Sequence, residues 1–209
     1  MDFKVVISPE LAAATMLGVP DKVIRRALNR TGRGARRELS RLIRQEYNIK
    51  QKTLYKYIKF YPAKKGEHVA ALRISARRIG LYHFVAPSSV RQWKQNPAGW
   101  VRRGNKYVRR PYVKVKVRKT SGWKLLEHAF IARMDSGHMG IFLRRKGWKH
   151  KWHPVKHRYH GLPIKELTAP SPVEMMEKVH GLKKLDDYII RRLKKELQHE
   201  IHYYYSVGW

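Results

Sequence analysis

The chain has 209 residues, of which 43% are hydrophobic, so it has the material for a folded domain with a sizeable core and is not a disordered basic tail. It contains 47 Lys and Arg against 15 Asp and Glu, and the resulting net charge of +32 predicts an anionic partner. The lack of cysteine excludes disulfide bridges and thiolate metal sites. The longest apolar stretch, residues 11–19, is too short to cross a bilayer, and the first residues do not follow the pattern of a secretory signal, so we expect no membrane partner.

The positive charge is concentrated in the first three quarters of the chain. Residues 68–126 contain 15 Lys and Arg and no acidic residue, and residues 21–59 contain 13 against 3. Residues 128–165 contain 9 basic residues and one acidic residue, whereas residues 166–209 contain 7 of each sign. This asymmetry predicts a body that faces an anion and a C-terminal segment that faces protein.

The N-terminal quarter predicts a short strand over residues 2–7 and a helix from Pro20 to about Tyr47. Apolar residues share one face of that helix, and a row of arginines lies on the opposite face: Arg26, Arg30, Arg33, Arg37, Arg41 and Arg44. The row is either an ordinary solvated face or a contact for nucleic acid, and only Glu38 and Glu46 are near enough in sequence to balance it. Gly32 and Gly34 predict a weak or bent middle.

The middle of the chain predicts a short helix and a series of strands. The helix is expected over residues 51–57, and the strands over 69–76, 79–85, 112–118, 129–134 and 140–145. Residues 87–111 are rich in turn residues and predict a basic-aromatic loop or protruding hairpin. Ser136 and Gly137 predict a tight connection between the last two strands.

The C-terminal segment predicts an amphipathic helix over residues 171–205, interrupted at Gly181. Ser171 and Glu174 form a capping box around Pro172. An apolar stripe follows at helical spacing: Leu182, Leu185, Ile189, Leu193, Leu197, Ile201 and Tyr204. Part of the stripe is expected to cover the chain's own sheet, and the rest to pack against a neighbouring subunit. The elements together predict a single α+β domain over residues 1–209, with long first and last helices on a small antiparallel sheet and extended basic loop insertions.

The sequence offers little for catalysis. His150, His153, His157 and His160 have a spacing that suits a metal, but Pro154 breaks the helix that would hold them, and lysines crowd the segment. Gly137–Gly140 matches a GXXG loop but lies between predicted strands, and Ser121 and Lys124 fit a Ser-x-x-Lys pattern without a helix. We therefore predict no enzyme, no metal and no cofactor.

Basic residues interleaved with aromatic ones predict contact with nucleic acid that does not depend on base sequence. The candidates in the middle of the chain are Arg102, Arg103, Lys106, Arg109, Arg110, Lys114 and Lys116, joined by Arg26, Arg30, Arg33 and Arg37 of the first helix. No helix-turn-helix or finger motif is present, so base-specific readout is not expected.

Three blocks of sequence together resemble the minor tail protein Z family of long-tailed bacteriophages. They are Ala27-Leu28-Asn29-Arg30-Thr31, the strand pair Ala129–Arg144 around Ser136-Gly137-His138, and Leu162–Ser171. The basic region 87–111 and the His- and Lys-rich segment 146–161 look like insertions in this pattern.

The resemblance implies a structural virion protein, assembled in the host cytoplasm, that completes the tail at its head-proximal end. Its expected partners are further copies in a ring of about six, the tail tube or tail terminator protein, head-tail connector proteins and double-stranded genomic DNA. We expect subunit contacts at Ile189, Leu193, Leu197, Ile201, Ser136, Gly137 and Phe142. The alternative, suggested by charge alone, is a free basic nucleic-acid-binding protein of ribosomal or nucleoid type.

Overall fold

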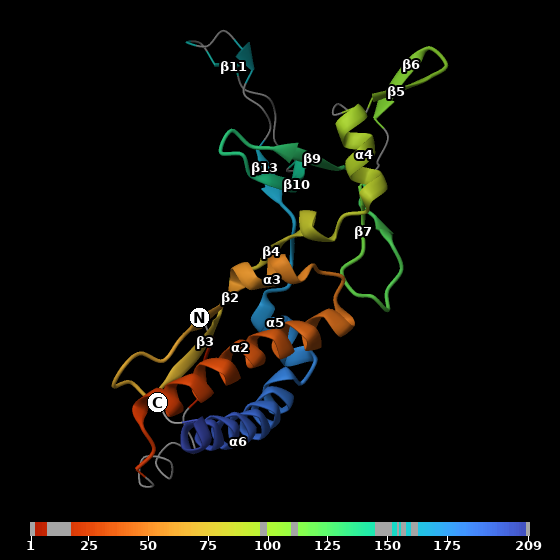
Figure 1. Cartoon of the computed structure of the whole chain (residues 1–209). Helices are drawn as coiled ribbons and strands as arrows, with labels where there is room; N and C mark the ends of the chain where they lie inside the picture. Colours follow the sequence, from red (N-terminus) through yellow and green to blue (C-terminus); the bar gives the residue numbers. More distant parts are fainter. Residues whose placement is uncertain are drawn as a thin grey trace. The chain divides into compact units, whose positions relative to one another are not determined.

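The computed structural model describes residues 3–7, 18–96, 100–109, 113–144, 152, 153, 155, 158, 159 and 163–207. The chain forms two compact units (Figure 1). Unit 1 consists of Met1–Arg78 and Pro170–Trp209, and unit 2 consists of Ile79–Ala169. Both segments that look like insertions, 87–111 and 146–161, belong to unit 2.

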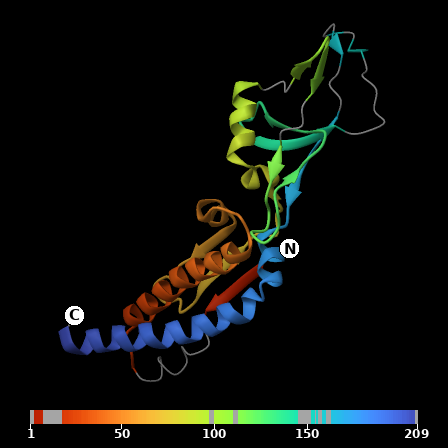
Figure 2. The ribbon, with the colours of Figure 1, turned by 90° about the vertical axis from the view of Figure 1, so that its right-hand side faces the viewer.

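Unit 1 combines a small sheet with two long helices. Its strands are β1 (Phe3–Ile7), β2 (Ile58–Tyr61) and β3 (Ala70–Ile74), and they form an antiparallel sheet in the order β1-β3-β2. Its helices are α2 (Asp21–Glu46), α3 (Gln51–Tyr57), α5 (Pro172–Lys178) and α6 (Gly181–Val207). Helices α2 and α6 lie side by side along most of their length (Figures 1 and 2). The predicted α+β class, with long first and last helices and a small antiparallel sheet, is confirmed.

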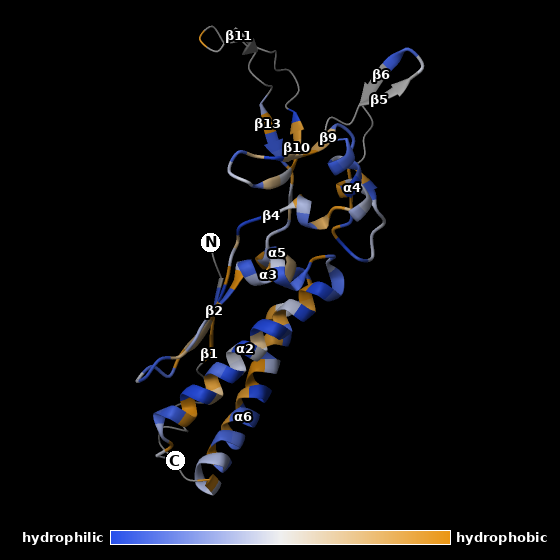
Figure 3. Ribbon diagram, turned by 45° about the horizontal axis from the view of Figure 1, so that its top comes forward, coloured by the Kyte–Doolittle hydropathy of each residue, from blue (hydrophilic) through white to orange (hydrophobic). Residues whose placement is uncertain are grey.

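Helix α2 forms because its apolar residues recur at helical spacing and bury one face. Ile24, Leu28 and Leu39 are completely buried, and Figure 3 shows hydrophobic residues recurring along both α2 and α6. The helix runs without a break through Gly32 and Gly34, so the glycines do not split it. A Cβ at Gly32 would collide with the Phe60 ring of β2, and one at Gly34 would lie 2.8 Å from the Tyr188 hydroxyl of α6. The glycines therefore let the sheet and α6 approach α2 closely.

The start of α5 follows the sequence prediction. The Glu174 N–H donates to Ser171 Oγ at 3.2 Å, and the Ser171 N–H donates to Glu174 Oε2 at 3.2 Å, which completes the capping box. The helix breaks at Val179 and His180, just before the predicted Gly181, and His180 has a φ of +50°. The long α6 begins directly after this break.

Unit 2 is built from short strands around a smaller core. Its elements are β4 (Ile79–Gly80), the 3-10 helix η1 (Leu81–Phe84), α4 (Pro87–Gln95), β5 (Trp100–Arg103), β6 (Lys106–Arg109), β7 (Lys114–Val115), β8 (Lys124–Leu125), β9 (Ala129–Arg133), β10 (Met139–Arg144), β11 (Trp152–His153), β12 (Arg158–Tyr159), β13 (Ile164–Glu166) and β14 (Thr168–Ala169). The largest sheet has the order β13-β10-β9, and the others are antiparallel pairs. Phe84, Ile131, Ile141 and Val113 are buried in this core.

Three predictions in unit 2 need correction. The strand expected over 79–85 is reduced to β4, because Leu81–Phe84 turn into η1 and bury Leu81 and Phe84. The loop expected from residue 87 begins instead as α4, with Pro87 in the first turn, where a missing N–H costs nothing. The strand expected over 112–118 is only β7, since the Lys116 N–H donates to the Phe84 carbonyl of η1 instead of to a strand.

The predicted strand pair around Ser136 and Gly137 is confirmed. Strands β9 and β10 pair with Met139 opposite Arg133 and Leu143 opposite Ala129. Gly137 has a φ of +81°, which the turn requires and which other residues adopt only with strain.

Candidate nucleic-acid interface

Two of the predicted DNA-contacting arginines are engaged inside unit 1. Arg30 Nη1 lies 2.5 Å from Glu200 Oε1 and 3.5 Å from Glu196 Oε2, and Arg26 Nη1 lies 3.7 Å from Glu200 Oε2. Both glutamates belong to α6 and are almost fully buried, whereas the arginine side chains are 42% and 47% exposed. The expectation that only Glu38 and Glu46 balance the arginine row is therefore wrong. We call this group of ion pairs the α2–α6 seam.

The other arginines of α2 have different surroundings. Arg33 and Arg37 are exposed. Arg36 lies 4.1 Å from the centre of the Tyr55 ring and donates to the Tyr55 carbonyl at 2.7 Å. Arg41 donates to Glu38 at 2.8 Å through Nε, and this hydrogen bond, with the arginine charge, holds the pKa of Glu38 below its ordinary value. Arg33, Arg37 and Arg44 are exposed members of the predicted row for which no ion pair is found among the described residues.

The densest cluster of predicted DNA-contacting cations lies on the hairpin β5–β6 of unit 2. Strands β5 and β6 pair with Arg102 opposite Tyr107 and Arg103 opposite Lys106, so the backbone brings the last two cations together beside the turn. Arg109 lies at the other end of the hairpin, opposite Trp100. Arg110 is outside the described residues.

Lys114 and Lys116 lie beyond this hairpin, on and just after β7. Val113 and Val115 are buried and Lys114 is exposed, so the alternation expected from the sequence is present. The Lys114 N–H donates to Ser89 Oγ at 3.0 Å, which ties β7 to α4. Lys116 is half-buried. The Ala86 N–H also donates to the Lys114 carbonyl at 2.9 Å. The backbone of Lys114 is therefore held by two hydrogen bonds, while its side chain is exposed to solvent.

Most of the predicted subunit-contact residues are core residues of the chain itself. Ile189, Leu193 and Leu197 are 4%, 1% and 8% exposed, on the side of α6 that packs against α2, and Phe142 is 5% exposed in unit 2. Their surface is already used within the chain, which corrects their assignment to a subunit contact. Three of the predicted positions keep accessible surface: Ile201, which is half-buried, and Ser136 and Gly137, which are exposed.

The described part of the chain contains no group of three or more His, Asp or Glu placed to hold a metal. Of the four histidines considered for a metal, only the backbone of His153 is described, in β11; His150, His157 and His160 lie outside the described residues. The Ser121 hydroxyl donates to the Arg118 carbonyl at 2.9 Å, a local turn contact. None of the described helices has the length and apolar content needed to cross a bilayer.

Comparison with known proteins decides the family. The model of the prophage minor tail protein Z family matches residues 16–207, which is nearly the whole chain. The chain belongs to this family. Neither the curated proteins nor the solved structures gave a significant match. As a member of the minor tail protein Z family, the protein is a structural component of a phage tail and part of the virion.

The three sequence blocks that carry the resemblance to the family have structural roles in the fold. Asn29 of the first block accepts from the Ala63 N–H at 2.8 Å and donates to the Ala63 carbonyl at 3.2 Å, which pins the segment after β2 to α2. The second block forms β9, the turn and β10, and the third contributes β13 and β14. These residues define the fold of the protein more directly than they define a binding site.

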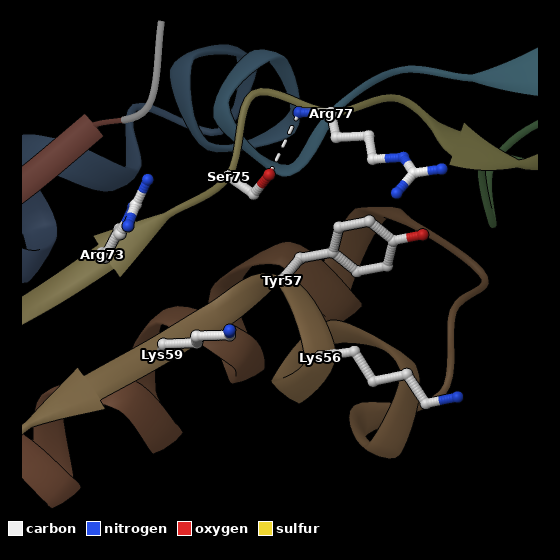
Figure 4. A pocket seen from close by; sticks show the side chains of 6 residues that line it. All are labelled: Lys56, Tyr57, Lys59, Arg73, Ser75 and Arg77. Carbon is white, nitrogen blue, oxygen red and sulfur yellow. Dashed lines mark hydrogen bonds between the residues drawn. The ribbon is translucent and has the colours of Figure 1, made fainter.

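Sequence reasoning missed one cationic site. Lys56, Lys59, Arg73 and Arg77, with Tyr57 and Ser75, line a pocket of about 400 Å³ in unit 1 (Figure 4). The strand over 69–76 was predicted, but its register against β2 was not. Lys56 and Lys59 are close in sequence, but they meet Arg73 and Arg77 only because β2 pairs with β3.

Proposed function

We propose that this protein is a tail-completion subunit that forms a closed ring at the head-proximal end of the tail. The ring surrounds the path of the genome and contacts its phosphates without reading bases. The observation that carries the DNA contact is the charge of residues 68–126, where 15 basic residues stand without a single carboxylate. Such a segment stays near other copies of itself only when a polyanion offsets the repulsion.

The hairpin β5–β6 is the proposed contact with DNA. Arg102, Arg103, Lys106 and Arg109 occupy its two short strands, and Arg110 follows directly in the sequence. Because these cations carry charge without a base-reading helix, the binding energy comes from counterion release and is the same for any sequence. Lys114 adds to the cationic surface of unit 2, and Arg33 and Arg37 form a cationic surface on unit 1.

Further copies of the chain, the tail tube or terminator protein and the connector proteins are the proposed protein partners. Ile201 on α6 and the turn at Ser136 and Gly137 are the candidate contact positions that keep accessible surface. About six copies are expected for a closed cyclic ring that matches a six-fold tail tube.

The decisive experiment reverses the hairpin charges in assembled phage. Arg102→Glu, Arg103→Glu, Arg109→Glu and Arg110→Glu are introduced together, and Lys178→Glu, Lys183→Glu, Lys184→Glu and Lys195→Glu serve as a control with the same charge change outside the hairpin. We expect the hairpin variant to enter particles and form the ring, while genome retention or infectivity falls about tenfold or more. The control should stay close to the parent phage.

Two results would contradict the proposal. One is normal infectivity of the hairpin variant, which removes these cations from the DNA path. The other is an electron-microscopic reconstruction of the neck in which this protein lies elsewhere in the tail. If the protein is missing from purified particles but binds nucleic acid tightly as a monomer, the alternative of a free basic nucleic-acid-binding protein is correct.

A further inference from the structure

The outer face of the sheet in unit 1 carries a row of cations across its three strands. Arg73 of β3 pairs directly with Lys4 of β1 on one side and with Lys59 of β2 on the other. All three side chains are exposed, while the next residues along the strands, Val5 and Leu72, are buried on the inner face. The row therefore points away from the core.

This arrangement places like charges next to each other on the sheet. Like charges directly opposite each other on antiparallel strands repel, because their Cβ atoms are only about 5 Å apart. None of the ion pairs found among the described residues involves Lys4, Lys59, Lys56 or Arg77. Lys4, Lys59, Lys56 and Arg77, the cations around Arg73, therefore suit a ligand of opposite charge.

The row continues into the pocket of Figure 4. Lys59 and Arg73 rise from neighbouring strands, Lys56 comes from α3, and Arg77 follows β3. The Arg77 N–H donates to Ser75 Oγ at 3.2 Å, and the Ser75 N–H donates to the Tyr57 carbonyl at 2.9 Å, so the segment after β3 is held against α3. The pocket has no acidic lining residue in the part of the chain that the structure describes.

A second hollow borders the row on the other side of Arg73. Lys4, Lys64, Tyr61 and Arg73 are among its lining residues, and Glu67 contributes the one carboxylate found there among the described residues. Cations thus outnumber carboxylates on both sides of Arg73. The surface suits a chain of negative charges better than a single small anion.

We infer that the row Lys4–Arg73–Lys59, with Lys56 and Arg77 at its end, binds the phosphodiester backbone of nucleic acid. Strands lie about 4.8 Å apart, so the row spans about 10 Å. One strand of duplex DNA carries a phosphate at every nucleotide, so a row of this length reaches more than one phosphate of the same strand. Lysine and arginine heads on a flat sheet face reach phosphates without entering a groove, and the contact is independent of sequence.

This inference deepens the proposed function by adding a second phosphate contact on unit 1, separate from the hairpin of unit 2. It is tested on the full chain with a 20-base-pair duplex of arbitrary sequence, by fluorescence anisotropy over a range of salt concentrations. The variant is Lys59→Gln with Arg73→Gln, and the control is Lys183→Gln with Lys184→Gln, two exposed lysines of α6 in the same unit. Circular dichroism confirms that each variant is folded.

We expect the slope of log affinity against log salt to fall by about 2 in the Lys59/Arg73 variant, or about 0.9 for each lost phosphate contact. Affinity at moderate salt should fall about tenfold or more, and the control should keep the parental slope. If the strand variant does not fold, Lys56→Gln with Arg77→Gln takes its place, since both residues lie outside the strands, and the same loss of slope is expected.

An unchanged slope in a folded Lys59/Arg73 variant overturns the inference. So does a variant that keeps its affinity for DNA but fails to enter tails, since the row then serves an acidic protein surface. A parent chain that does not bind the duplex overturns it as well. The proposed tail-completion role fails on different grounds, namely the position of the protein in the particle and the infectivity of the hairpin variant, so the two failures are distinguishable.

Discussion

Unit 1 handles its positive charge in two opposite ways. At the α2–α6 seam, Arg26 and Arg30 face the buried carboxylates of Glu196 and Glu200. On the outer sheet face, Lys59 and Arg73 stand opposite each other, and the pocket beside them has no acidic residue among its described lining residues.

The difference between the two regions separates cations that hold the fold together from cations that are available to a partner. Burial of a charge is tolerated when an opposite charge accompanies it, and the seam meets that condition. The cations of the sheet face are exposed, so they need no buried counter-charge, and an external anion can reach them. A net charge of +32 therefore does not mark every arginine as a DNA contact.

The largest expected effect comes from removing the carboxylates of the seam. Glu200→Gln keeps the shape of the side chain and removes its charge, which leaves Arg26 and Arg30 without their shared partner. We expect a loss of about 1–3 kcal/mol in the free energy of unfolding, limited by the water that reaches both arginines. Urea denaturation measures the free energy of unfolding of this variant. The control is Asp186→Asn, which removes an exposed carboxylate from the same helix. Equal effects of the two substitutions would show that the seam contributes nothing specific.

A smaller effect of opposite sign is expected on the sheet face. Lys59→Glu places a carboxylate opposite Arg73 and should raise the stability of the free protein by about 0.2–1 kcal/mol at low salt. The same change should weaken duplex binding, so stability and affinity move in opposite directions. Urea denaturation and anisotropy on one preparation measure both, with Lys183→Glu as the matched control. If Lys59→Glu lowers stability, repulsion across the strands is not the cost that we describe.

The smallest expected effect concerns the exposed pair of Glu38 and Arg41 on α2. The lowered pKa of Glu38 means that its charged form stabilises the folded state above the pKa of the unfolded chain, and that this contribution is lost as pH falls through the folded pKa. Glu38→Gln should therefore lower Tm by only about 1 °C at pH 7. Thermal melts from pH 7 down to pH 2 should show the two proteins converging. A gap that widens in acid would reverse the assigned sign.

Local signals predicted the elements that depend on neighbouring residues. The helix over 51–57 and the strand pair over 129–145 were found because periodicity and turn residues specify them within a few positions. The same reasoning missed α4, where Pro87 begins a helix inside a segment dominated by turn residues. It also missed the role of Gly32, which depends on Phe60, a residue of another element.

The residues of the candidate sites were harder to assign for the same reason. The sequence predicts that the apolar stripe of α6 serves both the core and a subunit contact. In the structure, Ile189, Leu193 and Leu197 are buried in the core. Both roles select the same residue types, so composition alone does not separate them. The cations of the hairpin were recognised because they are adjacent in sequence, whereas Lys4, Lys59 and Arg73 are far apart.

The amino-acid sequence by itself determined the excess of positive charge, the neutral C-terminal segment, the amphipathic helices and the capping box of Ser171, because each is a property of consecutive or helically spaced residues. Only the tertiary structure decided which charges meet. Strand register sets Arg73 between Lys4 and Lys59, and helix packing sets Arg30 against Glu196 and Glu200. Register and packing are fixed by burial of the opposite faces of the same elements, so the polar contacts follow from the core.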